Sequence, residues 1–475
     1  MMLNPMTRWI GAGVILLGAL TTFGQEPPAV DETPLPNVGH TRHHHPRTPK
    51  MPGTPDPARF TTSRPDALQL PLPEEKDAFT FVIFGDRTGG PAEGVRVLAD
   101  AVRDVNLLAP DLVMTVGDLI QGYNAQEPWI EQMREYRTIM DKLVCPWFPV
   151  AGNHDVYWRG PADQKPDGEH EQNYELHFGP LWYAFKHKRC VFIALYSDEG
   201  NPETGEKTFH KPESQRMSPE QFEWLKKTLA DNKDAEHIFL FLHHPRWLGS
   251  NTDGHGGYGD DWNKVHDELK AAGNVTAVFA GHIHHMRYDP KDGIEYVTLA
   301  TTGGGQSGLV PHVGFLHHYH VVTVRKGQVA MAAFPVGQVM DVREITGELV
   351  RHVTNLANSR LPMTGDLKLR SDGSVDGTFR IALTNPTDRD VDFTVALDSK
   401  DSRWRFWPDH EHGVVKAGET REFELGLRRP AGGFDESFRP ARVLIDAEYL
   451  APGFRYRVPQ RGVDVRLTLD EVLPP

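Results

Sequence analysis

The chain has 475 residues, 51 basic and 65 acidic, with a formal net charge of −14, 24 histidines and two cysteines. Two cysteines exclude a disulfide scaffold and a cysteine-based zinc framework, and the acidic balance argues against a protein that coats nucleic acid or an anionic membrane. Seventeen of the histidines lie between His154 and His320. A metal site built from histidine and carboxylate is therefore the first hypothesis to test.

The N-terminus has the pattern of an export signal. Arg8 precedes an apolar stretch from Trp9 to Phe23, which is shorter than the roughly 20 apolar residues of a membrane span. We therefore expect residues 1–24 to be a signal peptide, with an uncleaved anchor as the alternative, and the protein to be exported to the periplasm, the cell surface or the medium. Residues 25–76 are rich in proline and predict an extended linker, in which the histidine tract at 40–45 is interpreted as solvated chain.

Five short apolar runs follow, and each ends in side chains that bind metals. The runs are 79–84, 112–116, 148–151, 238–242 and 275–280. Their length and β-branched content predict strands. The polar residues that follow them are, in chain order, Asp86, Asp118, Asn153, His243, and His282 with His284.

Helical patterns separate several of these runs. Apolar residues recur at helical spacing over 95–102 and 129–140, and Ser218-Pro219 opens a third helix that buries Phe222, Leu225 and Leu229. Alternating strands and helices predict an α/β domain, in which ligands bind beyond the carboxyl ends of the strands. We therefore expect the polar clusters to meet at one rim of the sheet.

The donor set itself suggests a binuclear site. Six oxygen and imidazole donors are too many for one tetrahedral zinc ion and suit two ions that share a carboxylate. A Gly-Asp pair after a strand is common turn chemistry, but Gly-Asn-His-Asp after an apolar run is far more specific. His282 and His284 are expected to point the same way from an extended segment and to reach adjacent metals.

These motifs resemble the calcineurin-like metallophosphoesterase superfamily, in its bacterial exported type with a C-terminal β-sandwich. The resemblance runs from Phe79 to Phe334 and includes the Gly-rich segment Thr301–Gly305. It implies two mixed β-sheets packed face to face with helices outside both, an α/β fold of four layers. It also implies two divalent or trivalent metal ions (Fe, Mn or Zn) and hydrolysis of phosphate mono- or diesters by a hydroxide that bridges them.

The resemblance assigns each ligand a role. Asp118 would bridge the two metals, Asp86 and His284 would bind the first, and Asn153, His243 and His282 would bind the second. His243 is preferred to His244 because the family's ligand lies two residues before the proline. His154 would stabilise charge or protonate the leaving oxygen, with Asp155 orienting its ring.

The chain departs from the family pattern at the first metal. The usual motif is Asp-x-His, whereas this chain has Asp86-Arg87-Thr88, and threonine is a poor ligand. Purple acid phosphatases place a tyrosine three residues after the bridging aspartate, where this chain has Gln121, and Tyr123 is only a candidate. Arg87 is expected either to contact a substrate phosphate or to form a salt bridge at the rim.

The C-terminal part of the chain predicts a separate module. We expect a phosphoesterase domain at 77–340, a connecting helix within 341–359 and an immunoglobulin-like β-sandwich at 360–475. The predicted strands are 375–383, 391–397, 421–427, 441–449 and 463–469. A rival hypothesis is a catalytically weak metal-binding surface protein whose sandwich binds a polymer or a protein. Cys145 and Cys190 are expected to be buried free thiols rather than a disulfide.

Overall fold

The computed structural model describes residues 77–158, 170–201, 203–204, 206–207, 216–248, 261–432, 437–452 and 454–470. The predicted signal peptide and the linker with its histidine tract lie outside these residues. Within the described ranges no helix is long and apolar enough to cross a membrane.

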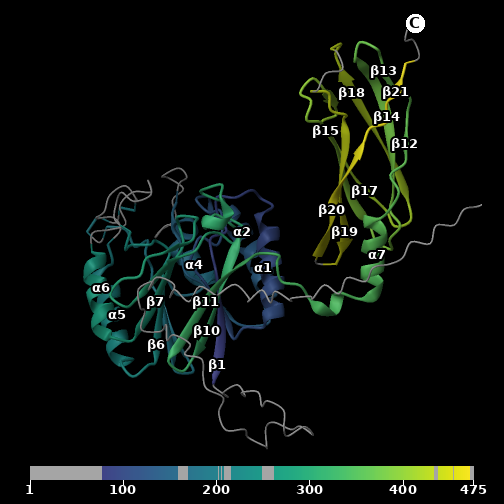
Figure 1. Cartoon of the computed structure of the whole chain (residues 1–475). Helices are drawn as coiled ribbons and strands as arrows, with labels where there is room; N and C mark the ends of the chain where they lie inside the picture. The colour runs from purple at the N-terminus through teal and green to yellow at the C-terminus, as the bar shows by residue number, and fades with distance from the viewer. Residues whose placement is uncertain are drawn as a thin grey trace, which may run out of the picture. The chain divides into compact units, whose positions relative to one another are not determined.

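The first sheet has five strands in the order β11–β10–β1–β2–β3 (Figure 1). β1, β2 and β3 run parallel, and β10 and β11 add an antiparallel edge. Their bounds are β1 Ala78–Phe84, β2 Leu112–Thr115, β3 Trp147–Phe148, β10 His318–Arg325 and β11 Gln328–Pro335.

The second sheet has six strands in the order β4–β5–β6–β7–β9–β8. Its centre is parallel, and β4 and β8 are antiparallel to their neighbours. The strands are β4 Tyr183–His187, β5 Cys190–Ala194, β6 His237–Phe241, β7 Val275–Ala280, β8 Arg287–Tyr288 and β9 Glu295–Thr298. The predicted mixed α/β class with mixed sheets is therefore confirmed.

The two sheets share a buried core of aromatic side chains. Phe81 of the first sheet packs against Phe192, Phe239 and Phe241 of the second, with ring centroids 5.0, 5.0 and 6.3 Å away. Each fully buried phenylalanine contributes about 1.5–3 kcal/mol of transfer free energy. The predicted rim of a single sheet is thus wrong, because β1, β2 and β3 lie in one sheet and β6 and β7 in the other.

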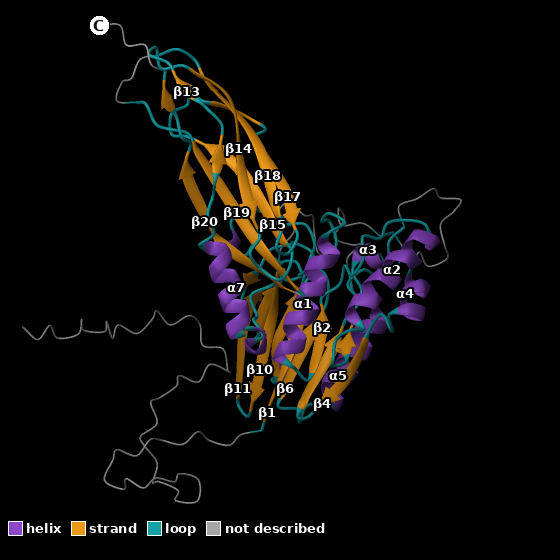
Figure 2. Ribbon diagram, turned by 90° about the vertical axis from the view of Figure 1, so that its right-hand side faces the viewer, coloured by secondary structure: helices purple, strands orange, loops and turns teal. Residues whose placement is uncertain are grey.

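Helices cover the outer faces of both sheets (Figure 1), and Figure 2 views the molecule from the side of α1 and α2. α1 (Gly94–Leu108) and α2 (Gln126–Met140) pack on the first sheet, and α5 (Pro219–Asp231) and α6 (Trp262–Ala272) on the second. The predicted cap of α5 is confirmed, since the Ser218 hydroxyl accepts a hydrogen bond from the Gln221 amide at 3.1 Å. Two short helices complete the layer, α3 at Asn153–Val156 and α4 at Glu171–His177.

The C-terminal residues form two antiparallel four-stranded sheets around a second core. Their orders are β12–β14–β18–β16 and β17–β15–β19–β20, and β13 pairs with β21. The longer strands are β14 Val375–Thr384, β15 Val391–Asp398, β17 His410–Val415, β18 Thr420–Arg429, β19 Arg442–Ala451 and β20 Phe454–Asp464. The short ones are β12 Met363–Thr364, β13 Lys368–Leu369, β16 Arg405–Trp407 and β21 Thr468–Leu469.

Two expectations for this region need correction. The predicted strand at 463–469 is broken, because β20 ends at Asp464 and β21 begins at Thr468. The connecting helix is also divided, into a 3-10 turn at Val342–Glu344 and α7 at Gly347–Ala357, whose start is capped by Thr346. Side chains along β14 and β15 alternate between buried and less buried positions, as expected for strands with one face in the core of a sandwich. The immunoglobulin-like type of this sandwich stays a prediction.

Both cysteines are free thiols, and Cys190 is buried in the core between the two mixed sheets. Burial raises the pKa of Cys190 to about 12. This thiol is therefore protonated and unreactive at neutral pH.

Candidate metal centre

The six predicted ligands converge although their loops leave two different sheets. Asp86, Asp118 and Asn153 follow β1, β2 and β3, and the three histidines follow β6 and β7. Asp86 and His243 are fully buried, and Asp118 and Asn153 are each 2% exposed. The side chains of His282 and His284 are only partly covered, so the cluster has one open side.

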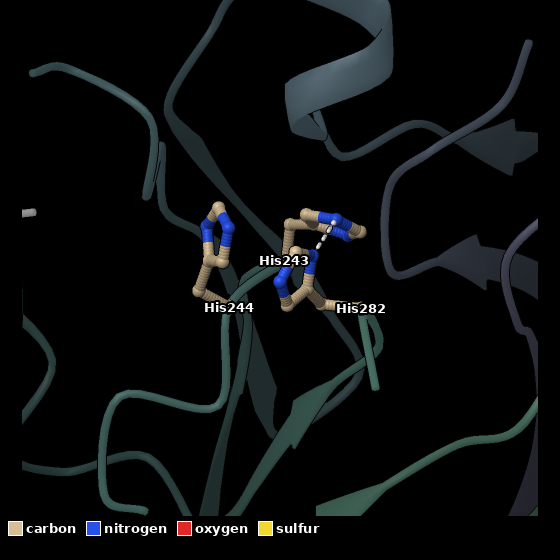
Figure 3. Close-up of side chains that lie close together, drawn as sticks. All are labelled: His243, His244 and His282. Atoms are coloured by element: carbon tan, nitrogen blue, oxygen red, sulfur yellow. Dashed lines mark hydrogen bonds between the residues drawn. The ribbon is translucent and has the colours of Figure 1, made fainter. Parts of the chain in front are cut away.

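One group of donors surrounds the side-chain oxygen of Asn153. Asn153 Oδ1 lies 2.9 Å from Nε2 of His243 and 3.0 Å from Nδ1 of His282. These two nitrogens are 3.2 Å apart, as the dashed line in Figure 3 shows. Oδ1 of Asp118 lies 3.2 Å from the same Nε2 of His243.

The chemistry of these atoms calls for a cation between them. Nδ1 of His243 lies 2.8 Å from the Val116 carbonyl, which only accepts, so this nitrogen carries the proton. In the neutral ring Nε2 then presents a lone pair to the oxygens of Asn153 and Asp118. Burial lowers the pKa of His243, but the Asp118 carboxylate outweighs it and raises that pKa to about 10. A proton or a metal ion at Nε2 satisfies all of these acceptors.

A second group forms around Asp86. Nε2 of His284 lies 3.3 Å from Oδ2 of Asp86, and the same oxygen accepts the His282 amide at 2.8 Å. The other oxygen, Oδ1, is buried without a hydrogen bond. Donor atoms of Asp86, Asp118 and His243 lie within 4.8 Å of one another. An orphaned buried carboxylate oxygen in this position fits a metal ligand.

Asp118 lies between the two groups. Burial by itself raises its pKa, but the charges of His243 and His154 hold that pKa well below the usual range. Burial, followed by His244 and His243, lowers the pKa of His282 well below its ordinary value. The cluster therefore presents an ionised carboxylate and a neutral imidazole, which are the forms that bind metal.

Backbone geometry brings the ligands together at the cost of strain. Asp118, His282 and His284 have φ of 54°, 70° and 55°, a region that non-glycine residues seldom adopt. The predicted extended segment at 282–284 is therefore wrong. A bent backbone sends the two rings to different donor groups, His282 to Asn153 and His284 to Asp86. Strained residues of this kind concentrate at functional sites.

Thr88 and Tyr123 both contact predicted ligands. The hydroxyl of the buried Thr88 donates a hydrogen bond at 3.1 Å to Oδ2 of Asp118, the carboxylate expected to bridge the metals. The hydroxyl of Tyr123 accepts a hydrogen bond from the Asn153 amide nitrogen. Tyr123 therefore lies with the donors predicted for the second metal, not the first.

The role expected of Asp155 is wrong, because its carboxylate turns away from the His154 ring. It accepts the backbone amides of Leu119, Ile120 and Gly152 at 2.9, 3.2 and 2.8 Å. The His154 ring is oriented instead by the Gln121 carbonyl, 2.5 Å from Nδ1. A carbonyl fixes the proton on Nδ1, so Nε2 faces the cluster, 4.0 Å from Oδ2 of Asp118.

Neither expectation for Arg87 matches its surroundings. Arg87 is 5% exposed, and its Nη2 donates to the Ala92 carbonyl at 3.3 Å. Its Nε and Nη1 are buried without hydrogen bonds. Burial lowers the pKa of the guanidinium. Arg87 thus lies under the start of α1, covered by Gly94 and Gly303 rather than open at the rim.

His244 is a neighbour of the cluster that the sequence did not assign. Its ring centroid lies 4.1 Å from that of His282, and the donors of His243, His244 and His282 lie within 4.8 Å of one another (Figure 3). Its Nδ1 lies 3.2 Å from Oδ1 of Asp198 and 3.2 Å from the Ser197 hydroxyl. The doubled histidine before Pro245 was the only signal for it.

Several other histidines and aromatic residues of this part of the chain are held by contacts within the fold. His317 contacts the Thr301 hydroxyl at 3.0 Å, and His318 and His320 are buried on β10. Trp247 packs against Tyr296, and Tyr288 is 44% exposed. Trp247 therefore packs against the core of the second sheet.

Comparisons with known proteins point to one family. Residues 79–286 match the family model of calcineurin-like phosphoesterases. This match supports the superfamily assignment. Human tartrate-resistant acid phosphatase type 5 is 26% identical over 244 residues, which cover 46% of this chain and 71% of that protein. Purple acid phosphatase 21 of Arabidopsis thaliana is 25% identical over 257 residues, covering 51% of this chain and about half, 54%, of that protein.

A solved structure shows a weaker similarity. The crystal structure of a dimetal phosphatase from Danio rerio aligns with a TM-score of 0.41 and 17% identity, over 54% of this chain and 99% of that one. Calcineurin-like phosphoesterases depend on two metal ions, and the described residues of this chain include two overlapping groups of side chains that could hold a metal ion.

Proposed function

We propose that this protein is an exported phosphoesterase that uses two metal ions to hydrolyse phosphate monoesters or diesters. The observation that carries the proposal is the convergence of Asn153 Oδ1, His243 Nε2 and His282 Nδ1, all within 3.2 Å of one another. Asn153 Oδ1 and the two imidazole nitrogens, when these are unprotonated, are donor atoms that one metal ion can share. Export is proposed from the N-terminal apolar stretch alone.

The proposed ligand sets divide at Asp118. Asp86, His284 and Asp118 would hold one ion, and Asp118, Asn153, His243 and His282 the other. Two such ions, when bound, supply Lewis acidity and lower the pKa of water. Iron, manganese and zinc all suit this mixture of carboxylate, amide and imidazole donors.

His154 has the geometry of a proton donor to the leaving group. Its Nδ1 proton is held by the Gln121 carbonyl, so Nε2 is the atom that faces a bound phosphoester. Its side chain is 23% exposed, while Asp118 beside it is 2% exposed. Protonated Nε2 can give its proton to the ester oxygen while a water molecule attacks phosphorus, loses a proton and forms the new P–O bond. The old P–O bond breaks, so a monoester gives an alcohol and phosphate, and a diester gives an alcohol and a phosphate monoester.

The test is hydrolysis of an aryl phosphate monoester and diester by purified protein reconstituted with each metal. Asn153→Ala removes the central oxygen and should lower kcat/KM by about 100-fold or more, the order found when one polar stabilising group is lost. The matched control is Asn106→Ala on α1, where the amide bonds Lys142 and Val144. The proposal fails if wild type and Asn153→Ala are equally active, or equally inactive, with every metal.

A further inference from the structure

The loop that follows β2 contacts both residues of the Asn153-His154 pair. The Tyr123 hydroxyl accepts a hydrogen bond from Nδ2 of Asn153, and the Tyr123 ring lies over that of His154 with centroids 3.9 Å apart. The Gln121 carbonyl lies 2.5 Å from Nδ1 of His154. This loop, Gln121–Tyr123, therefore touches the predicted ligand and the predicted proton donor at once.

The contact to Asn153 decides which way its amide faces. An asparagine side chain has one oxygen and one nitrogen, and only the oxygen can bind a metal. With Nδ2 directed to the Tyr123 hydroxyl, Oδ1 must face the opposite side, where it lies 2.9 Å from His243 and 3.0 Å from His282. The flipped amide would place N–H groups against these imidazoles and would leave no oxygen for a metal.

The loop is built to hold the tyrosine in this position. Gly122 and Tyr123 have φ of 56° and 55°, and a Cβ at Gly122 would stand 1.6 Å from the His154 carbonyl oxygen. The Gly122 amide donates to Oε1 of Gln132 at 2.9 Å. The Gln121 side chain bonds the Gly89 amide and the Gly90 carbonyl, both at 3.0 Å. A tyrosine keeps a left-handed backbone conformation only where contacts with its neighbours hold it there.

We propose that Tyr123 is a positioning residue that orients the Asn153 amide toward the second metal, and that it binds neither metal itself. The inference rests on the proposed function, because it assigns Asn153 to that metal. It places the tyrosine of this chain in a different role from the first-metal tyrosine of purple acid phosphatases. The residue acts through a hydrogen bond, so its effect depends on the presence of Asn153.

The experiment measures metal affinity rather than turnover. Manganese and zinc are titrated into metal-free protein against a chromogenic chelator, which reports the affinity of each of the two sites. Tyr123→Phe keeps the ring over His154 and removes the hydroxyl. It should weaken the second site by about 10- to 100-fold, the usual effect of losing a group that orients a ligand, and leave the first site unchanged.

Two further proteins make the result specific. Tyr183→Phe is the matched control, since it removes a hydroxyl that donates to the Pro149 carbonyl at 2.8 Å and not to a predicted ligand. Asn153→Ala supplies the background for a double-mutant cycle. Adding Tyr123→Phe to Asn153→Ala should change neither affinity, because no amide remains to be oriented.

Each outcome has a separate meaning. Equal second-site affinity in wild type and Tyr123→Phe overturns the inference, and so does a further loss of affinity in the double variant, which would make Tyr123 a ligand. Wild-type protein that binds no metal overturns the proposed function instead. Two metals in the wild type, a selective loss in Tyr123→Phe and no further loss in the double variant support the inference.

Discussion

Single residues decide how closely the ligands approach, and the glycines beside them show this most clearly. A Cβ at Gly281 would stand 2.1 Å from Oδ1 of Asp86, and one at Gly152 would stand 2.4 Å from Oδ1 of Asp118. Both atoms belong to predicted ligands. Gly152 and Gly281 are therefore required because a neighbouring predicted ligand occupies the space of a side chain.

Gly281→Ala should disturb the first metal site more than the fold. The added methyl group meets the movable end of Asp86 and a methyl group of Val116, at 2.1 and 2.9 Å. We expect first-site metal affinity to fall at least tenfold and the free energy of unfolding to fall by about 1–3 kcal/mol. Chelator competition and urea unfolding measure the two quantities. Gly347→Ala, where a Cβ meets nothing within 4 Å, is the control. Unchanged metal affinity in Gly281→Ala would contradict the expectation.

At the level of elements, β10 carries titratable groups into the core between the mixed sheets. His318 is fully buried, and Nδ1 lies 3.3 Å from the Leu316 carbonyl. Burial lowers the pKa of His318 to about 4, and burial with the neighbouring His318 lowers that of His320 well below its ordinary value. Both imidazoles are therefore neutral in the folded protein at neutral pH.

This burial predicts a loss of stability in acid. Between pH 6.5 and pH 4 the unfolded chain binds a proton at His318 and the folded chain does not, so the free energy of unfolding falls as the pH falls. The contribution of His318 over that range is about 3 kcal/mol. Urea unfolding at several pH values should show that the free energy of unfolding changes less with pH in His318→Gln than in the wild type, because glutamine cannot titrate. An identical slope in both proteins would show that His318 does not contribute.

The whole molecule has two separate hydrophobic cores, and we expect the stability of each to respond independently to metal. The core between the mixed sheets is made by residues 79–329, and the sandwich core by residues 356–465. All six predicted ligands precede residue 285. Metal binding should therefore stabilise the part of the chain that is built around the two mixed sheets and leave the sandwich unchanged.

Calorimetry with and without chelator tests this division. Metal at 100 times its dissociation constant adds about 2.7 kcal/mol to the folded state that binds it. We expect two thermal transitions, and we expect the chelator to lower the midpoint temperature of only one of them. A single transition, or two that move together, would contradict the expectation. In the Asn153→Ala protein, the chelator should lower the midpoint temperature of that transition by less than in the wild type.

Several features could be predicted from the sequence because they depend on local patterns. Four of the five strands could be located to within one residue because apolar runs end sharply at polar residues, whereas the run at 148–151 overlaps β3 only at Phe148. The cap of α5 could be predicted because serine and proline act within one turn. The six donors could be named because each lies within four residues of the end of such a run, while the choice of His243 over His244 came from the family resemblance. α6 was missed since its start follows the Gly-rich residues 249–260, and β16 and β17 because short edge strands carry little apolar signal.

Other features were decided only by tertiary structure. The separation of β1–β3 and β6–β7 into two sheets depends on long-range pairing with β10 and β5, which local patterns do not encode. Three contacts of the site were equally hidden from local patterns: Asp155 with Leu119, Gln121 with His154, and Tyr123 with Asn153. The two residues of each pair are at least 30 positions apart in the chain. The sequence by itself determined which side chains can bind metal, because donor chemistry belongs to the residue. Only the folded chain decided which atoms face one another, because side-chain orientation depends on neighbours that are distant in sequence.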